Sequence, residues 1–117
     1  MKILVCGDRN WTDIEKIFDI LSQYPKDTII IEGEANGADK IASIIAKELG
    51  MTVESYPAEW GKYGKAAGPL RNRKMLEIGK PDKVLAFHNN ISTSKGTKNM
   101  ISIAKKANIL VELYTTK

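Results

Sequence analysis

The sequence predicts a three-layer α/β fold, in which helices cover both faces of a five-stranded parallel sheet of order 3-2-1-4-5. Short apolar segments alternate along the chain with segments whose apolar residues recur at helical spacing. The apolar segments are almost uninterrupted, which is typical of strands buried on both faces. One of them, Ile29–Ile31, runs directly into a turn with two glycines before a helical pattern begins. Such alternation is typical of a doubly wound sheet with right-handed crossovers.

Five strands are expected where apolar runs end at glycine, proline or polar residues. The first run stops at Gly7 and the third at Pro57. The expected strands cover residues 2–6, 28–31, 51–56, 83–87 and 109–114.

The first two helices are expected between these strands. Thr12 and Glu15 fit a capping box at the start of the first helix, and Pro25 closes it. Gly50 is the expected end of the second helix. Helical spacing predicts two buried stripes: Ile14, Ile17, Phe18 and Leu21 in the first helix, and Ile41, Ile44, Ile45 and Leu49 in the second.

The last two helices have terminal signals of the same kind. Residues 59–65 are expected to form a polar loop, and the third helix to run from Gly68-Pro69 to Gly79, because proline suits a first turn. The fourth opens at Gly96 and can be capped by Asn108. Its expected buried stripe is Met100, Ile103, Ala104 and Ala107.

Length and composition place the chain among ordinary globular proteins. The 117 residues suit one domain, residues 1–117, with one modest core. A single cysteine excludes an internal disulfide and favours a cytoplasmic location. No apolar run approaches the roughly 18 residues that span a bilayer, so no membrane partner is expected. The net charge of +4, with Lys and Arg taken as spread along the chain, permits nucleic-acid contact without requiring it.

A binding site is expected at the carboxyl edge of the sheet, between the first and fourth strands, where strand order reverses. Four polar, glycine-rich segments should meet there: residues 7–11, 32–39, 60–72 and 88–97. The opposite edge has little besides turns that close helices.

The segment Ser92–Thr97 could cradle a phosphate at a helix start, with Lys95 adding charge. A capped helix end is an equally good interpretation. Neither G-x-G-x-x-G nor a P-loop is present, so ATPase or GTPase activity is not expected. Arg71 is the better placed of two neighbouring arginines to clamp an anion, whereas Arg73 and Lys74 suit a solvated face.

Four acidic residues, Asp8, Glu32, Glu34 and Asp39, should converge near these donors. They could hold ribose hydroxyls, hold Mg²⁺ that arrives with a nucleotide, or stabilise an oxocarbenium-like state in N-glycosidic cleavage. The sequence leaves these roles open.

Several motifs together resemble the YspA-like family of the SLOG superfamily, over nearly the whole chain. The similarity rests on five motifs, and Gly68–Asn72 is its most specific part. The motifs are Val5–Trp11, Glu32–Asp39, Pro57–Trp60, Gly64–Met75 and Gly96-Thr97. The superfamily includes the Lonely Guy phosphoribohydrolases and the Rossmann-like domain of DNA processing protein A. The resemblance implies a Rossmann-like fold and a nucleotide-derived ligand such as NAD, ADP-ribose or AMP.

The chain departs from the Lonely Guy pattern at its catalytic positions. Arg71 matches the catalytic arginine of those enzymes, but Met100 stands where their catalytic glutamate would be. Phosphoribohydrolase activity would then require a different carboxylate, among Glu32, Glu34 and Glu59.

Three hypotheses follow: a nucleotide-binding sensor or sequestering module, an N-glycosidase acting on nucleoside 5′-monophosphates, and a single-stranded DNA-binding module. The third rests on basic residues near Trp60 and Tyr63. Arg71, Glu34 and Glu32 are the candidate catalytic residues, and a homo-oligomer is expected. The candidate ligand-binding residues are Gly7, Asp8, Arg9, Gly33, Glu34, Gly37, Asp39, Arg71, Asn72, Ser94, Lys95, Gly96 and Thr97.

Overall fold

The computed structural model describes residues 1–116 and contains the predicted parallel sheet. Its strand order is β3-β2-β1-β4-β5. The strands are β1 (Lys2–Gly7), β2 (Ile29–Glu32), β3 (Thr52–Ser55), β4 (Lys83–Phe87) and β5 (Leu110–Tyr114). The helices are α1 (Ile14–Leu21), α2 (Ala38–Glu48), α3 (Trp60–Tyr63), α4 (Ala67–Glu77) and α5 (Gly96–Lys106). The predicted fold class is therefore confirmed.

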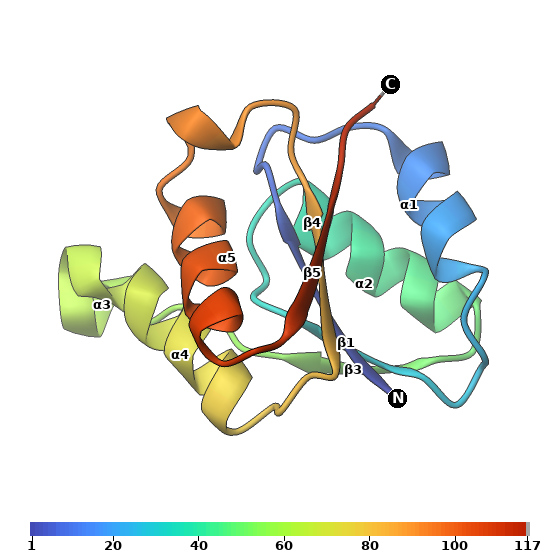
Figure 1. The fold of residues 1–117 in the computed structure, drawn as a ribbon, viewed down its shortest axis with the longest axis horizontal. Coiled ribbons are helices and arrows are strands. Elements are labelled where there is room, and N and C mark those ends of the chain that lie inside the picture. Colours follow the sequence, from blue (N-terminus) through green and yellow to red (C-terminus); the bar gives the residue numbers. More distant parts are fainter. Residues whose placement is uncertain (117) are drawn as a thin grey trace.

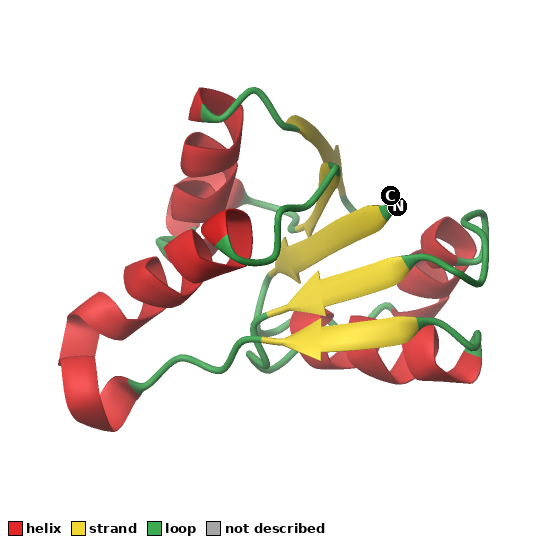
Figure 2. Ribbon diagram, turned by 90° about the horizontal axis from the view of Figure 1, so that it is seen from below, coloured by secondary structure: helices red, strands yellow, loops and turns green. Residues whose placement is uncertain are grey.

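The helices cover the sheet from both sides (Figures 1 and 2): α1 and α2 on one face, and α4 and α5 on the other. Side chains of β1 alternate between the two cores, as the two-residue period of a strand requires. Ile3 and Val5 pack in the core under α1 and α2, whereas Leu4 and Cys6 pack in the core under α4 and α5. The central strand therefore ties the two halves of the molecule together.

The first helix begins one residue later than the capping box predicts. Asp13, not Thr12, is the N-cap, and its Oδ1 accepts a hydrogen bond from Lys16 N at 3.1 Å. Only Ile17 and Leu21 of the predicted stripe are buried. Ile14 (58% exposed) and Phe18 (44%) face outward, because an eight-residue helix seats only a narrow face against the sheet.

The predicted stripe of the second helix is also partly wrong. Ile45 is buried, but Ile44 is 60% exposed, and the rest of the buried face is mainly small. Ala38, Ala42 and Ala46 lie against the sheet, because small side chains let the helix backbone approach closely. Gly50 ends this helix with φ +80°, as predicted.

Residues 59–65 were expected to form a loop and are instead mostly helical. The chain forms α3, then a 3₁₀ turn at Gly64–Ala66, and continues into α4 with Pro69 in its first turn. In α5, Ile101 replaces Ala107 in the buried stripe, and Ile103 is only partly buried. Asn108 follows α5 with φ +60°, as expected of a residue that ends a helix.

Candidate functional site

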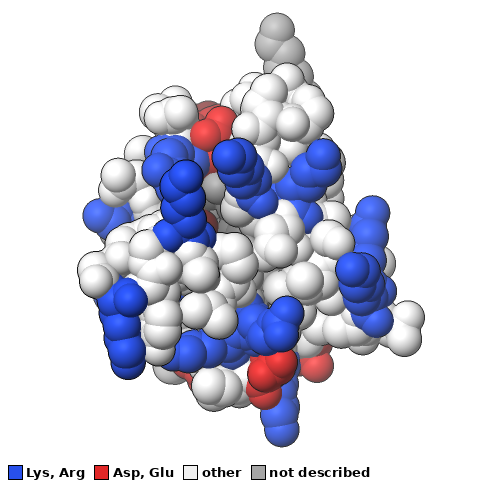
Figure 3. All heavy atoms as spheres, turned by 90° about the vertical axis from the view of Figure 1, so that its left-hand side faces the viewer, with Lys and Arg blue, Asp and Glu red and all other residues white. Residues whose placement is uncertain are grey.

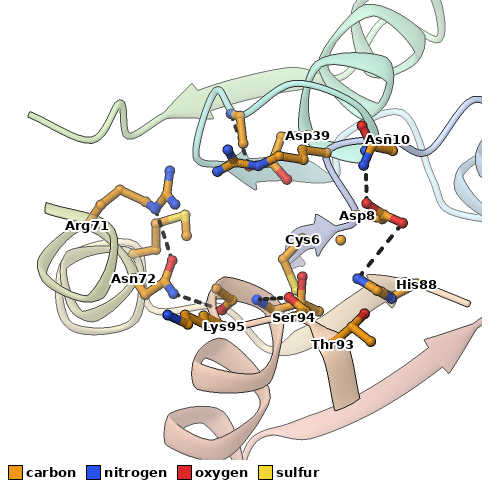
Figure 4. Close-up of a pocket in the computed structure, with 16 residues that line it drawn as sticks. Cys6, Asp8, Asn10, Asp39, Arg71, Asn72, His88, Thr93, Ser94 and Lys95 are labelled. Carbon is orange, nitrogen blue, oxygen red and sulfur yellow. Dashed lines mark hydrogen bonds and ion pairs between the residues drawn. The ribbon is translucent and has the colours of Figure 1, made fainter. Parts of the chain in front are cut away.

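A cavity of about 460 Å³ opens at the carboxyl ends of β1 and β4, where the strand order reverses. Its walls come from the turn after β1, the loop after β2, helix α4, the residue after β4 and the start of α5 (Figure 4). The volume lies within the range of small-molecule sites in proteins. The four polar segments that the sequence singles out thus all contribute to one cavity.

Most of the candidate ligand-binding residues line this cavity. They are Gly7, Asp8, Arg9, Asp39, Arg71, Asn72, Ser94, Lys95, Gly96 and Thr97. Gly33, Glu34 and Gly37 do not line it, and neither does Glu32. The sequence interpretation missed six lining residues: Cys6, Asn10, Ala35, Met75, His88 and Thr93. Asn10, Ala35, His88 and Thr93 lie inside the polar segments and could have been included on that ground.

Arg71 is held in place by two hydrogen bonds. Its Nη1 donates to the Gly33 carbonyl at 2.6 Å, and its Nε donates to Asn72 Oδ1 at 2.9 Å. The amide of Asn72 in turn donates to the Gly96 carbonyl and to Asn99 Oδ1 (Figure 4 shows the first of these). The guanidinium is therefore positioned by contacts that join the loop after β2, α4 and the start of α5.

Gly33 contributes to this arrangement although it does not line the cavity. A Cβ at position 33 would lie 2.8 Å from Cζ of Arg71 and 2.9 Å from its Cδ. Only a residue without a side chain lets the guanidinium lie directly on this backbone.

Gly37 allows the turn after β1 to pack closely against the start of α2. It has φ +76°, and a Cβ there would collide with the backbone of Asp8 and Arg9. The neighbouring Ala38 N–H donates to the Asp8 carbonyl at 3.1 Å. Gly37 thus places Asp8 and Arg9 at the cavity without contacting it.

Asp39 is a buried carboxyl group in the wall of the cavity. Its Oδ2 accepts hydrogen bonds from the backbone N–H groups of Gly33 at 2.9 Å and Ala35 at 3.4 Å. Burial raises the pKa of Asp39 to about 7, although the Arg71 guanidinium and these N–H groups act in the opposite direction. The group therefore changes charge near neutral pH.

The two glutamates predicted to be catalytic do not line the cavity. Glu32 is buried and accepts hydrogen bonds from the backbone N–H of Glu34, at 2.6 Å, and from the hydroxyl of Ser55. Burial raises the pKa of Glu32. Glu34 is exposed, with φ +57°. Within residues 1–116, the only carboxyl groups that line the cavity belong to Asp8 and Asp39.

Asp8 and His88 face each other across the floor of the cavity (Figure 4). His88 Nδ1 accepts a hydrogen bond from the N–H of Asn90 at 2.9 Å, so the neutral ring carries its proton on Nε2. That nitrogen lies 3.9 Å from Asp8 Oδ2, too far for a hydrogen bond. His88 can therefore offer a donor to a ligand atom, which the sequence interpretation did not foresee.

The start of α5 forms the opposite wall. Ser94 Oγ accepts a hydrogen bond from the Thr97 N–H at 3.0 Å and so caps the helix. Lys95 is exposed and lines the cavity. A capped helix end and three positive groups (Arg9, Arg71 and Lys95) therefore surround the same space.

Cys6 lies at the base of the cavity and is buried, so it packs as a small apolar residue. Burial raises the pKa of its thiol, which keeps the group protonated. Among the residues that the structure describes, no group of three or more His, Cys, Asp or Glu could hold a metal ion. None of the helices in residues 1–116 is long and apolar enough to cross a membrane.

A parallel sheet of this order with a polar cavity at its switch point defines a Rossmann-like α/β domain. The chain belongs to the YspA, cpYpsA-related SLOG family, whose model matches residues 1–63. It is 34% identical over 119 residues to the Gene 61 protein of Mycobacterium phage D29, covering 94% of this chain and 93% of that protein. The resemblance inferred from the motifs is thereby confirmed.

The fold is also similar to a solved structure, that of DNA processing protein A (DprA) from Streptococcus pneumoniae. The TM-score is 0.78 and the sequence identity 17%, so the likeness concerns the fold alone. The match covers 96% of this chain and 49% of the DprA chain. The chain thus spans about half the length of that protein.

Proposed function

We propose that this chain binds a nucleotide-derived ligand of the ADP-ribose, NAD or AMP type in the cavity between β1 and β4, as a sensor or sequestering module. The observation that carries the proposal is the charge around the cavity. Arg9, Arg71 and Lys95 face it together with Asp8 and Asp39, and burial keeps much of the Asp39 population neutral near pH 7. The surplus of positive charge favours an anionic ligand.

The ligand's phosphate would lie between Arg71 and the start of α5, where a guanidinium and the positive end of a helix dipole face the same space. Asp8 would accept hydrogen bonds from sugar hydroxyls, and His88 Nε2 would donate one. Mg²⁺ would reach the site with the phosphates of the ligand and is not needed to build the cavity.

Binding is favoured over N-glycosidic cleavage. Of the carboxylates expected to stabilise a sugar cation, Glu32 and Glu34 do not line the cavity. Asp39 does line it, but this group accepts two backbone hydrogen bonds and its pKa is raised to about 7. The resemblance places Met100 at the position of the Lonely Guy glutamate. Chromatography of AMP incubated with the protein tests this choice, since release of adenine would establish the enzyme instead.

Thermal denaturation with and without ADP-ribose, NAD and AMP at about 1 mM tests the proposal. A ligand present at 100 times its Kd stabilises by about 2.7 kcal/mol, which raises the melting temperature by several degrees. Gly33→Ala should abolish this increase, because the added methyl group takes the place of the Arg71 side chain. Without ligand, its melting temperature should stay within about 3 °C of the wild type, because a flexible side chain can move aside.

Gly61→Ala is the matched control, because no atom lies within 4 Å of the added methyl group. It should keep the full ligand effect. The proposal fails if none of the three nucleotides raises the melting temperature, or if Gly33→Ala responds as the wild type does.

The expected homo-oligomer and cytoplasmic location stay predictions, as does the organisation of residues 1–117 as one domain. Light scattering coupled to gel filtration would measure the mass of the particle and decide the first of these.

A further inference from the structure

The charge of the chain is strongly divided along the sequence. Residues 60–106 contain eleven Lys or Arg and two Asp or Glu, a net charge of +9. Residues 1–59 contain six Lys or Arg and eleven Asp or Glu, a net charge of −5. The modest overall value of +4 hides this division.

The fold turns this division into a basic face. Residues 60–106 supply α3, α4 and α5, which lie on one side of the sheet, whereas α1 and α2 lie on the other. Figure 3 views the molecule from the side of α3, α4 and α5, and Lys and Arg side chains are spread over this face, with few acidic ones. We call the exposed surface of these three helices the basic face.

The cations of the basic face are not neutralised within the molecule. Among residues 1–116, lysine–carboxylate ion pairs join Lys2 to Glu54 and Lys83 to Glu112, and neither pair lies on α3, α4 or α5. The exposed cations of these helices are Lys62, Arg73, Lys74, Lys98, Lys105 and Lys106. A surface of unpaired like charges is suited to an external polyanion.

Lys95, which directly precedes α5, and two exposed lysines of α5 form a line that begins at the cavity. Lys95, Lys98 and Lys105 recur at intervals of three and seven residues, which places them on one side of a helix. At 1.5 Å per residue, the line is about 15 Å long. It is several times longer than the axial rise of about 3.4 Å per nucleotide in one strand of a duplex, so it can contact more than one phosphate of a polymer.

Aromatic side chains at the edge of the basic face favour a single strand over a duplex. Trp60 is 53% exposed, and its ring lies against α4, because a Cβ on Gly68 would be 3.3 Å from Cη2 of the indole. Tyr63 is 40% exposed, and Lys62 Nζ lies 5.1 Å from its ring centroid. Exposed rings can stack on unpaired bases, which a duplex does not offer.

A second hollow, of about 210 Å³, opens beside Tyr63. Leu70, Arg71 and Lys74 also line it, together with one acidic residue, Glu59, so apolar and mainly cationic groups adjoin an aromatic ring. Arg71 lines both this hollow and the large cavity, which are therefore adjacent.

We propose that the basic face binds single-stranded nucleic acid, with lysines of α5 and α4 along the phosphates and Trp60 and Tyr63 against the bases. This surface adjoins the nucleotide cavity at Arg71 and Lys95 but extends beyond it, and the proposal does not depend on the function of the cavity. The nucleic acid is bound without sequence preference, because the lysines contact phosphates and the two aromatic rings stack on the faces of bases.

The test is the fluorescence anisotropy of a labelled oligothymidylate of about 20 nucleotides, titrated with the protein at about 20 to 200 mM NaCl. The variant Lys98→Gln/Lys105→Gln removes two cations from α5. It should reduce the slope of log K against log salt by about 1.4, and weaken binding about tenfold at low salt. Lys40→Gln/Lys47→Gln is the matched control, since both lysines are exposed and seven residues apart on α2, on the opposite face. It should change affinity less than twofold.

Tryptophan fluorescence tests the aromatic contact. Trp11 is buried, so quenching by the strand should report on Trp60 and disappear in Trp60→Phe. The proposal is overturned if no binding is detected at 20 mM salt, or if both double variants weaken binding equally. It is also overturned if a duplex and heparin bind as tightly as the single strand while Trp60→Phe binds unchanged, because that result indicates charge attraction alone.

The two proposals fail separately. Gly33→Ala should lose the response to mononucleotides and keep its affinity for the single strand. Lys98→Gln/Lys105→Gln should keep the response to mononucleotides and bind the single strand about tenfold more weakly at low salt. Loss of both activities in both variants would contradict the separation of the two surfaces.

Discussion

At the scale of single residues, Asp39 connects the stability of the chain with the charge of the cavity. Its carboxyl group holds two backbone N–H groups of the loop after β2, and burial raises its pKa to about 7. In an unfolded chain, an aspartate has a pKa near 3.9. The folded state therefore holds this proton more strongly than the unfolded state does.

The sign of the pH dependence follows from that difference. The stabilising contribution of the neutral carboxyl is fully present below about pH 4, and it is lost as the pH rises through about 7. Urea denaturation at pH 5, 6, 7 and 8 should show wild-type stability falling by about 2–4 kcal/mol relative to Asp39→Asn, whose side chain cannot ionise. Asp19→Asn, exposed on α1, is the control and should follow the wild type. Parallel curves for Asp39→Asn and the wild type would refute the assignment.

The sequence predicted where Asp39 lies but not how it behaves. The turn after a buried strand and the helix pattern place it at the start of α2, beside the cavity. Its pKa depends on its burial and on the charge of Arg71, which is 32 residues away in the sequence and is brought near by the fold. The donor geometry of His88 depends likewise on a hydrogen bond to Asn90 that has no signature in the sequence.

At the scale of elements, α5 shows how one helix end serves both the fold and the cavity. The Ser94 hydroxyl caps the helix by accepting from the Thr97 N–H, and the same end faces the proposed phosphate position. Ser94→Ala should lower the free energy of unfolding by about 1 kcal/mol, the usual cost of a lost cap. ADP-ribose should still raise the melting temperature, because its phosphate can accept from the N–H that the serine released.

Ser102→Ala is the control for this prediction, because it makes the same substitution on the exposed side of α5, away from its ends. Its stability should be equal to the wild type or slightly higher, since alanine favours helices. If Ser94→Ala matches Ser102→Ala in urea denaturation, the cap contributes nothing to stability.

Element boundaries and strand order could be predicted because strand and helix periods differ and connections are right-handed. Helix faces could not be predicted as well, because hydrophobicity alone does not reveal how closely a helix approaches the sheet. In α2 the close approach buries Ala42 and Ala46 and leaves Ile44 outside. The same limit applies to α3, where glycines in a polar segment suggested a loop but tolerate a short helix.

At the scale of the whole molecule, charge is the property that the sequence interpretation misjudged. It took Lys and Arg as evenly spread, yet the count was available: residues 60–106 carry a net charge of +9 and residues 1–59 carry −5. The fold then separates these parts onto opposite sides of one sheet. The net charge of the whole chain conceals the basic face, and no motif or hydrophobic periodicity in the sequence indicates it.

Such a face should also affect the stability of the protein without any ligand. Unpaired like charges on α3, α4 and α5 repel one another in the folded state, and dissolved ions screen the repulsion over about 10 Å at 0.1 M salt. The melting temperature should therefore rise by about 3 °C between roughly 10 and 200 mM NaCl.

Lys98→Gln/Lys105→Gln should melt at a higher temperature than the wild type at low salt, and its melting temperature should respond less to salt. Lys40→Gln/Lys47→Gln should not gain stability, because on the acidic side each lysine is attracted by its surroundings. A wild-type melting temperature that falls with added NaCl would mean that attraction between the two sides outweighs repulsion within the basic face.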